Sequence, residues 1–170
     1  MTRLKWLIIA GTLAGFPANA GATTSPQLAE QALRLHNNER AALGLPPLVW
    51  NERLAKSAEA WAANLSHGGT LHHEHQSGQS GQGENLWMGS SGHYSVDEMI
   101  NDWSAEKARF RRGRAPVIRN RDDWEAVGHY SQMVWRETRA VGCAIAHSPD
   151  WDVLVCRYDP PGNVWGQNPF

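Results

Sequence analysis

Apolar residues recur every three to four positions over much of the chain, which is the spacing of an amphipathic helix. The first such segment begins after Ser25, which suits an N-cap, and ends before Gly44 and the prolines that follow it. The second segment, NERLAKSAEAWAANLS, covers residues 51–66 and opens with Asn51 as its cap. These two segments predict two helices, each with one apolar face for a core.

A third helix is predicted over SVDEMINDWSAEKARF, residues 95–110. Its first residue, Ser95, is followed three positions later by Glu98, and this pair forms the capping-box pattern. A fourth, shorter helix is predicted to start near GHYSQMVW, residues 128–135. Between the second and third helices, residues 72–83 have the composition of a loop, and the following ENLWMGSSG is typical of a short strand.

Alternating positions near the C-terminus predict a hairpin of two strands. VGCAIA and DVLVCRY have the period of strands, and HSPDWD between them contains turn residues. Such a hairpin could bring together the two cysteines of the chain, Cys143 and Cys156, as a disulfide in an exported protein. Two free buried thiols are the alternative, because the sequence alone does not fix the register that a disulfide requires.

These elements predict an α/β domain in which a small sheet is flanked by helices. The first 20 residues differ in character: they have a short basic start, an apolar run too short to span a bilayer, and a small-x-small ending at Ala20. We expect a secretory signal peptide over residues 1–20, with a retained membrane anchor as the alternative. Residues 21–170 then form a single secreted domain, extracellular, or periplasmic if the source is a Gram-negative bacterium.

The charge of the chain argues against one class of partner. Without the two basic residues of the leader, 14 basic residues stand against 17 acidic ones, a net charge of −3. We therefore expect no nucleic-acid partner, and no later segment is apolar enough for stable membrane insertion. The run from Lys107 to Arg121 holds seven basic residues and no acid. It could meet phosphate, anionic lipid or an acidic polysaccharide, but a solvated loop balanced by the following acids is the favoured interpretation.

Four ordered motifs carry a resemblance to a known family. They are GENLW at 83–87, WSAEK at 103–107, GHYSQMVWRET at 128–138 and VLVCRYDPPGNVWG at 153–166. Together they resemble the signature blocks of the CAP superfamily, which comprises the cysteine-rich secretory proteins, antigen 5 and the plant pathogenesis-related class-one proteins. The first two helical segments also resemble those of this family, so the resemblance covers essentially the whole chain after the leader.

This resemblance implies a three-layer α-β-α sandwich of the CAP (SCP) type, with a small, mainly antiparallel sheet and a central cleft. It also implies that two histidines and two glutamates line the cleft. The residues of this chain that match are His73, Glu84, Glu106 and His129. His72 and His75 lie beside the first of these, and either of them is an alternative to His73.

Two neutral imidazoles that face one cavity make half of a zinc site, because zinc usually takes four ligands. Under the resemblance, His73 and His129 are therefore candidate ligands of a weakly bound Zn²⁺ or another divalent cation. A glutamate would be a third ligand, or would hold an imidazole from behind. The HHEH sequence is not a zincin motif, which needs two histidines one helical turn apart. The alternative is structural, with His–Glu pairs that only hydrogen-bond.

The sequence thus predicts a secreted protein whose cleft binds a divalent metal, a small lipid or another ligand such as the end of a glycan. One alternative is a metal-dependent hydrolase of peptides or esters, with Glu84 or Glu106 as its candidate catalytic base. Another is an extracellular interaction protein that binds a protein partner and in which the four residues are only structural. Four other histidines are predicted to be surface or packing residues: His36, His67, His93 and His147.

Overall fold

The structure is a computed structural model that describes residues 21–74, 81–109, 121–164 and 166–170. The predicted signal peptide lies outside the described residues, as do His75 and most of the basic run.

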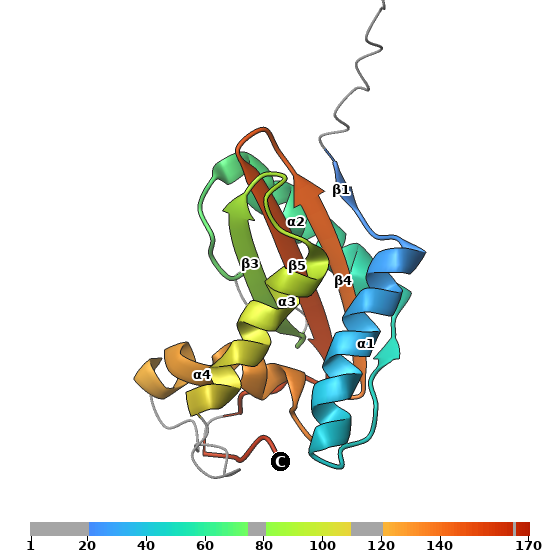
Figure 1. Cartoon of the computed structure of the whole chain (residues 1–170), viewed down its shortest axis with the longest axis vertical. Coiled ribbons are helices and arrows are strands. Elements are labelled where there is room, and N and C mark those ends of the chain that lie inside the picture. Colours follow the sequence, from blue (N-terminus) through green and yellow to red (C-terminus); the bar gives the residue numbers. More distant parts are fainter. Residues whose placement is uncertain (1–20, 75–80, 110–120, 165) are drawn as a thin grey trace, which may run out of the picture.

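Five strands form one sheet at the centre of the structure (Figure 1). They are β1 (Ala22–Thr23), β2 (Val49–Trp50), β3 (Gly83–Ser90), β4 (Ala140–His147) and β5 (Trp151–Asp159). The strand order is β1-β4-β5-β3 with antiparallel neighbours, and the short β2 pairs in parallel with β4. Strands β4 and β5 form the predicted hairpin.

Helices cover both faces of this sheet (Figure 1). They are α1 (Pro26–Ala42), α2 (Glu52–Gly68), α3 (Val96–Ala105) and α4 (Arg121–Met133), and the 3₁₀ turn η1 (Glu106–Arg109) follows α3. Helix α2 packs on one face, against β4 and β5, and α1 and α3 pack on the other. The predicted three-layer α-β-α arrangement is confirmed. No helix in the described ranges is both long enough and apolar enough to cross a membrane.

Two helix boundaries differ from the prediction. The segment predicted as one helix over residues 95–110 is α-helical only to Ala105 and then tightens into η1. Helix α4 begins at Arg121, well before the GHYSQMVW motif. Gly128, the first residue of this motif, lies inside the helix rather than at its start. A glycine within a helix lowers stability but does not have to end the helix.

The disulfide between Cys143 and Cys156 joins the two central strands. These residues are direct partners in the β4–β5 register, and their Cα atoms are 4.1 Å apart. Both side chains are completely buried. The predicted disulfide is therefore confirmed, and the alternative of two free thiols is wrong.

His36 lies in the core between α1 and β5, as a packing residue. Its Nδ1 is 2.7 Å from the carbonyl oxygen of Ala32, and its Nε2 is 2.8 Å from the hydroxyl oxygen of Tyr158. A neutral ring satisfies both contacts by donating from Nδ1 and accepting at Nε2. Burial, aided by the positive charge of Arg40 and opposed by the Ala32 hydrogen bond, lowers the pKa of His36 from 6.5 to about 4.

His36 is expected to make the fold sensitive to acid between pH 6.5 and about pH 4. In this window the unfolded chain binds a proton at His36 that the folded chain does not bind. The free energy of unfolding should therefore fall with decreasing pH, by up to about 1.4 kcal/mol per pH unit from this group. Urea unfolding at several pH values should show a shallower slope for His36→Gln than for the wild type. Identical slopes would contradict the assignment.

Candidate functional site

A first histidine–glutamate pair lies at the start of β3. His73 Nδ1 is 2.5 Å from Glu84 Oε1, and the same oxygen accepts the backbone N–H of Glu74 at 3.3 Å. The Glu84 side chain is only 2% exposed, whereas that of His73 is 39% exposed. The buried carboxylate thus holds a histidine whose ring remains open to solvent.

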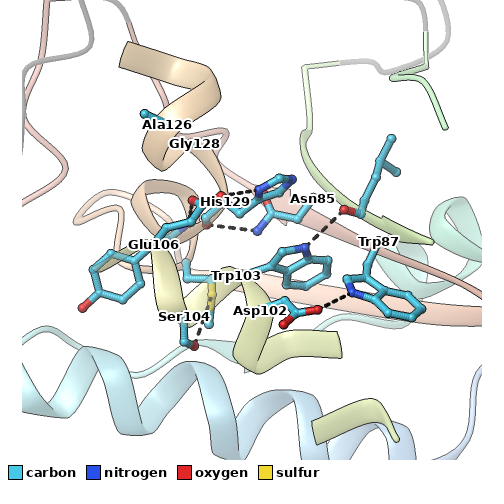
Figure 2. A network of polar contacts seen from close by, with 12 residues as sticks. Asn85, Trp87, Asp102, Trp103, Ser104, Glu106, Ala126, Gly128 and His129 are labelled. Carbon is cyan, nitrogen blue, oxygen red and sulfur yellow. Dashed lines mark hydrogen bonds and ion pairs between the residues drawn. The ribbon is translucent and has the colours of Figure 1, made fainter. Parts of the chain in front are cut away.

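A second pair lies where η1 meets α4 (Figure 2). His129 Nδ1 is 2.7 Å from Glu106 Oε1, and Glu106 Oε2 accepts the backbone N–H of Tyr130 at 3.0 Å. The His129 ring stacks on the indole of Trp103, with ring centroids 5.9 Å apart and planes 12° apart. The second imidazole is therefore held by a carboxylate on one side and an aromatic face on the other.

Side chains of the GENLW and WSAEK motifs fasten β3 to α3 and α4 (Figure 2). Asn85 Nδ2 donates to the carbonyl oxygen of His129 at 3.1 Å. Trp103 Nε1 donates to the carbonyl oxygen of Leu86 at 3.2 Å, and Trp87 Nε1 donates to Asp102 Oδ2 at 2.8 Å. These bonds set the distance between the strand that carries Glu84 and the helix that carries His129.

Both pairs meet at one cleft of about 270 Å³ between the segment before β3, strand β3 and α4. His73, Glu84 and His129 line this cleft, and Glu106 lies behind His129 without lining it. His72 also lines the cleft, but its Nδ1 contacts the carbonyl oxygen of Thr70. The structure thus brings the four predicted residues together, while the alternative His75 lies outside the described residues.

Comparison with known proteins shows the family to which this chain belongs. Residues 33–158 match the model of the CAP family, described as the cysteine-rich secretory protein family. The chain belongs to the CAP family. This match covers most of the chain and includes three of the four motifs in full and the first six residues of the fourth, so His73, Glu84, Glu106 and His129 all lie within the matched region.

The relatives of this CAP domain come from plants and animals. The chain is 35% identical over 139 residues to pathogenesis-related protein 1C of Nicotiana tabacum, covering 81% of this chain and 78% of that protein. It is 33% identical over 173 residues to cysteine-rich secretory protein 3 of Homo sapiens, covering 92% of this chain and 68% of that protein.

Solved structures bear out the fold. The crystal structure of NaASP2 with Zn²⁺ has a TM-score of 0.73 and 23% sequence identity, covering 92% of this chain and 90% of that one. The structure of BmVAL-1 has the same TM-score with 22% identity, covering 91% and 86%. At these identities the likeness supports the CAP fold alone.

A buried arginine behind the cleft was not predicted. Arg157 on β5 is 0% exposed, and its Nη2 lies 3.0 Å from Glu84 Oε2 and 2.5 Å from Glu74 Oε2. The available signal in the sequence was a charged residue inside the apolar strand DVLVCRY. Charged side chains are almost never fully buried without a partner, so this arginine indicated buried carboxylates nearby.

The cleft residues carry an excess of negative charge. Among the described residues that contact one another here, the three carboxylates of Glu74, Glu84 and Glu106 stand against the guanidinium of Arg157, which leaves two negative charges when the imidazoles are neutral. This charge favours a cation over an anion as a ligand.

The donor set of this CAP cleft fits a metal ion only in part. Among the described residues, no group of three His, Cys, Asp or Glu side chains could hold a metal ion. Each imidazole contacts its glutamate through Nδ1, so a metal would be held through Nε2 of His73 and of His129. A carboxylate behind a metal-binding imidazole is the usual arrangement, because it fixes the tautomer and raises the basicity of the ligand.

A third histidine–carboxylate pair lies at the other end of the sheet. His147 Nδ1 is 2.7 Å from Asp152 Oδ1, and Asp152 pairs with Gly89, near the end of β3 opposite Glu84. Partial burial acts to raise the pKa of Asp152, but hydrogen bonds from His147 and two neighbouring groups outweigh it, so the pKa lies below its usual value. This pair does not line the cleft and provides a control for the two that do.

Proposed function

We propose that the cleft of this CAP domain binds a divalent cation, with Zn²⁺ the best match, through Nε2 of His73 and Nε2 of His129. The observation that carries this proposal is that each ring has its Nδ1 on a glutamate, at 2.5 Å and 2.7 Å. Imidazole is a preferred ligand of zinc. The carboxylates hold both rings in the tautomer that leaves Nε2 to coordinate.

Such a site is reversible and open. A structural zinc site has four protein ligands, whereas the described part of this cleft offers two imidazoles that are each held by a carboxylate. Water or a ligand in the cleft would supply the remaining positions. Leu71 and Leu86 also line the cleft, so a small molecule with an apolar part and a coordinating group fits it best. The excess negative charge of the cleft supports a divalent cation.

A relative in fold gives further support for zinc: NaASP2 has been crystallised with Zn²⁺.

The place where the protein acts is a separate part of the proposal. The family is one of secretory proteins, and the disulfide suits an oxidising compartment. We therefore infer that residues 1–20 are removed as a signal peptide and that residues 21–170 act outside the cytoplasm as one domain.

The geometry gives hydrolysis no separate support. Glu84 and Glu106, the candidate bases, each accept an imidazole N–H and a backbone N–H. Carboxylates held in this way orient their histidines, and a general base must instead reach the water that it activates. An interaction protein with a purely structural cleft would use the same hydrogen bonds without binding a metal, so metal binding is the property to measure.

Calorimetric titration of the purified protein with Zn²⁺ at neutral pH tests the proposal. We expect one Zn²⁺ per chain, removable by a chelator, because the cleft has one pair of imidazole ligands. In parallel NMR spectra, the side-chain nitrogen signals of His73 and His129 should shift on addition of Zn²⁺, and those of His147 should not. Absence of binding, or binding that leaves both cleft histidines unchanged, would refute the proposed function.

A further inference from the structure

Arg157 is buried in a way that stability does not explain. Its side chain is 0% exposed, yet only Nη2 contacts carboxylate oxygens. Among the described residues, Nε and Nη1 of Arg157 have no hydrogen-bond partner. A buried charge with unpartnered N–H groups lowers stability relative to a well-packed apolar side chain. The residue therefore points to a role in the cleft beside it.

The contacts of Arg157 close a ring that includes the segment carrying His73. Arg157 Nη2 lies 3.0 Å from Glu84 Oε2 and 2.5 Å from Glu74 Oε2. The backbone N–H of Glu74 in turn donates to Glu84 Oε1 at 3.3 Å, which closes the ring. Glu84 Oε1 is also the atom that accepts from His73 Nδ1. The ring thus ties strand β3, strand β5 and the residue next to His73 into one unit.

The two histidines of the cleft need different amounts of support. His129 is on helix α4, its ring stacks on Trp103, and its carboxylate is fixed by a backbone N–H of the same helix. His73 belongs to residues 71–74, which are neither helix nor strand, whereas the exposed fractions of the two histidine side chains are similar, 39% and 37%. The position of His73 therefore depends on side-chain contacts, while that of His129 follows from the fold.

We propose that Arg157 and Glu74 are positioning residues that hold the His73 imidazole in the cleft with Nε2 directed to a cation. Arg157 orients the Glu84 carboxylate and draws in the Glu74 side chain, and both contacts fix the backbone on the C-terminal side of His73. The consequence for Zn²⁺ affinity rests on the proposed function. The positioning of the His73 ring does not depend on metal binding and can be measured in the metal-free protein.

The first arm of the test uses the metal-free protein. Long-range ¹⁵N–¹H NMR spectra report which imidazole nitrogen carries the proton. We expect the wild-type His73 to be protonated at Nδ1, and Glu74→Gln and Arg157→Gln to give a mixture of tautomers at His73 with His129 unchanged. Unchanged His73 signals in Glu74→Gln would overturn the proposal. Glu74 is partly exposed, at 26%, so this variant tests it even where Arg157→Gln fails to fold.

The second arm measures Zn²⁺ affinity and separates positioning from charge. Glu74→Gln removes a negative charge and Arg157→Gln removes a positive one, so charge alone would move the two affinities in opposite directions. Positioning predicts that both variants bind Zn²⁺ about 10-fold more weakly. Glu125→Gln, which removes a carboxylate that lines the same cleft but lies outside the ring, is the comparison variant for the loss of a negative charge. A tighter-binding Arg157→Gln would overturn the proposal, whereas a wild type that binds no Zn²⁺ would refute only the proposed function.

Discussion

Replacement of both His73 and His129 by alanine is expected to abolish zinc binding in the cleft. His73 and His129 are the two imidazoles of the described cleft whose Nδ1 is held by a carboxylate, and the remaining carboxylates are held by N–H groups and Arg157. Loss of both ligands should lower the affinity by at least about 100-fold, since even residues behind the ligands are worth 10–100-fold. Calorimetry with Zn²⁺ gives the measurement.

The doubly substituted protein is expected to remain folded. Both histidine side chains are more than a third exposed, and each glutamate keeps a second partner: Glu84 keeps Arg157, and Glu106 keeps the Tyr130 N–H. Its free energy of unfolding should fall by only about 1–2 kcal/mol. Unchanged zinc binding in this folded variant would show that the metal is held elsewhere.

His147→Ala is the matched control for this experiment. His147 has the same kind of pair, Nδ1 to a carboxylate at 2.7 Å, and its side chain is also more than a third exposed, but it lies at the other end of the sheet. If a histidine–carboxylate pair alone were sufficient for zinc binding, this variant would lower the stoichiometry. We expect no change, because a second imidazole facing the same cavity is the distinguishing feature of the cleft.

Local features of the fold could be predicted from the sequence because they depend on neighbouring residues. The side chains of Ser25, Asn51 and Ser95 cap α1, α2 and α3 as expected. Each cap accepts a hydrogen bond from a backbone N–H within three residues. These caps can therefore be predicted from the local sequence alone. The boundaries of α4 and of η1 depend on tertiary packing, and here the prediction was wrong.

The family resemblance predicted some of the contacts between distant segments and missed others. The resemblance pointed to His73, Glu84, Glu106 and His129, which helical and strand periodicity could not have grouped. Arg157 and Glu74 are 83 positions apart and were missed. The ion pair of Arg157 with Glu84 depends on the β3–β5 register, which places these two residues directly opposite each other. Register is a property of the folded sheet, and local patterns do not specify it.

Arg40→Met is expected to cause a large loss of stability. Arg40 is 0% exposed and donates to four backbone carbonyl oxygens. Its Nε reaches Pro46 at 2.7 Å, its Nη1 reaches Met133 at 3.1 Å and Trp135 at 2.8 Å, and its Nη2 reaches Thr138 at 3.1 Å. Burial and the nearby Arg139 lower its pKa to about 10, so it stays charged at neutral pH.

Methionine fills a similar volume but leaves the carbonyl groups without this donor. Each buried acceptor left unpaired lowers stability, and removing one side of a buried charged network typically costs about 3–5 kcal/mol. Denaturant unfolding should show this loss as a lower midpoint at an unchanged slope. Arg34→Met is the control on the same helix: its ion pair with Asp97 is exposed, and we expect a loss of less than about 1 kcal/mol.

The position of these carbonyl groups links Arg40 to the cleft. Met133 is the last residue of α4, the helix that carries His129, and Trp135 and Thr138 lie in the connection to β4. Arg40 therefore fixes the C-terminal end of α4 against α1, and Arg40→Met should also weaken Zn²⁺ binding through His129 while leaving the His73 tautomer unchanged. A variant as stable as Arg34→Met would show that the four carbonyl groups do not depend on this guanidinium.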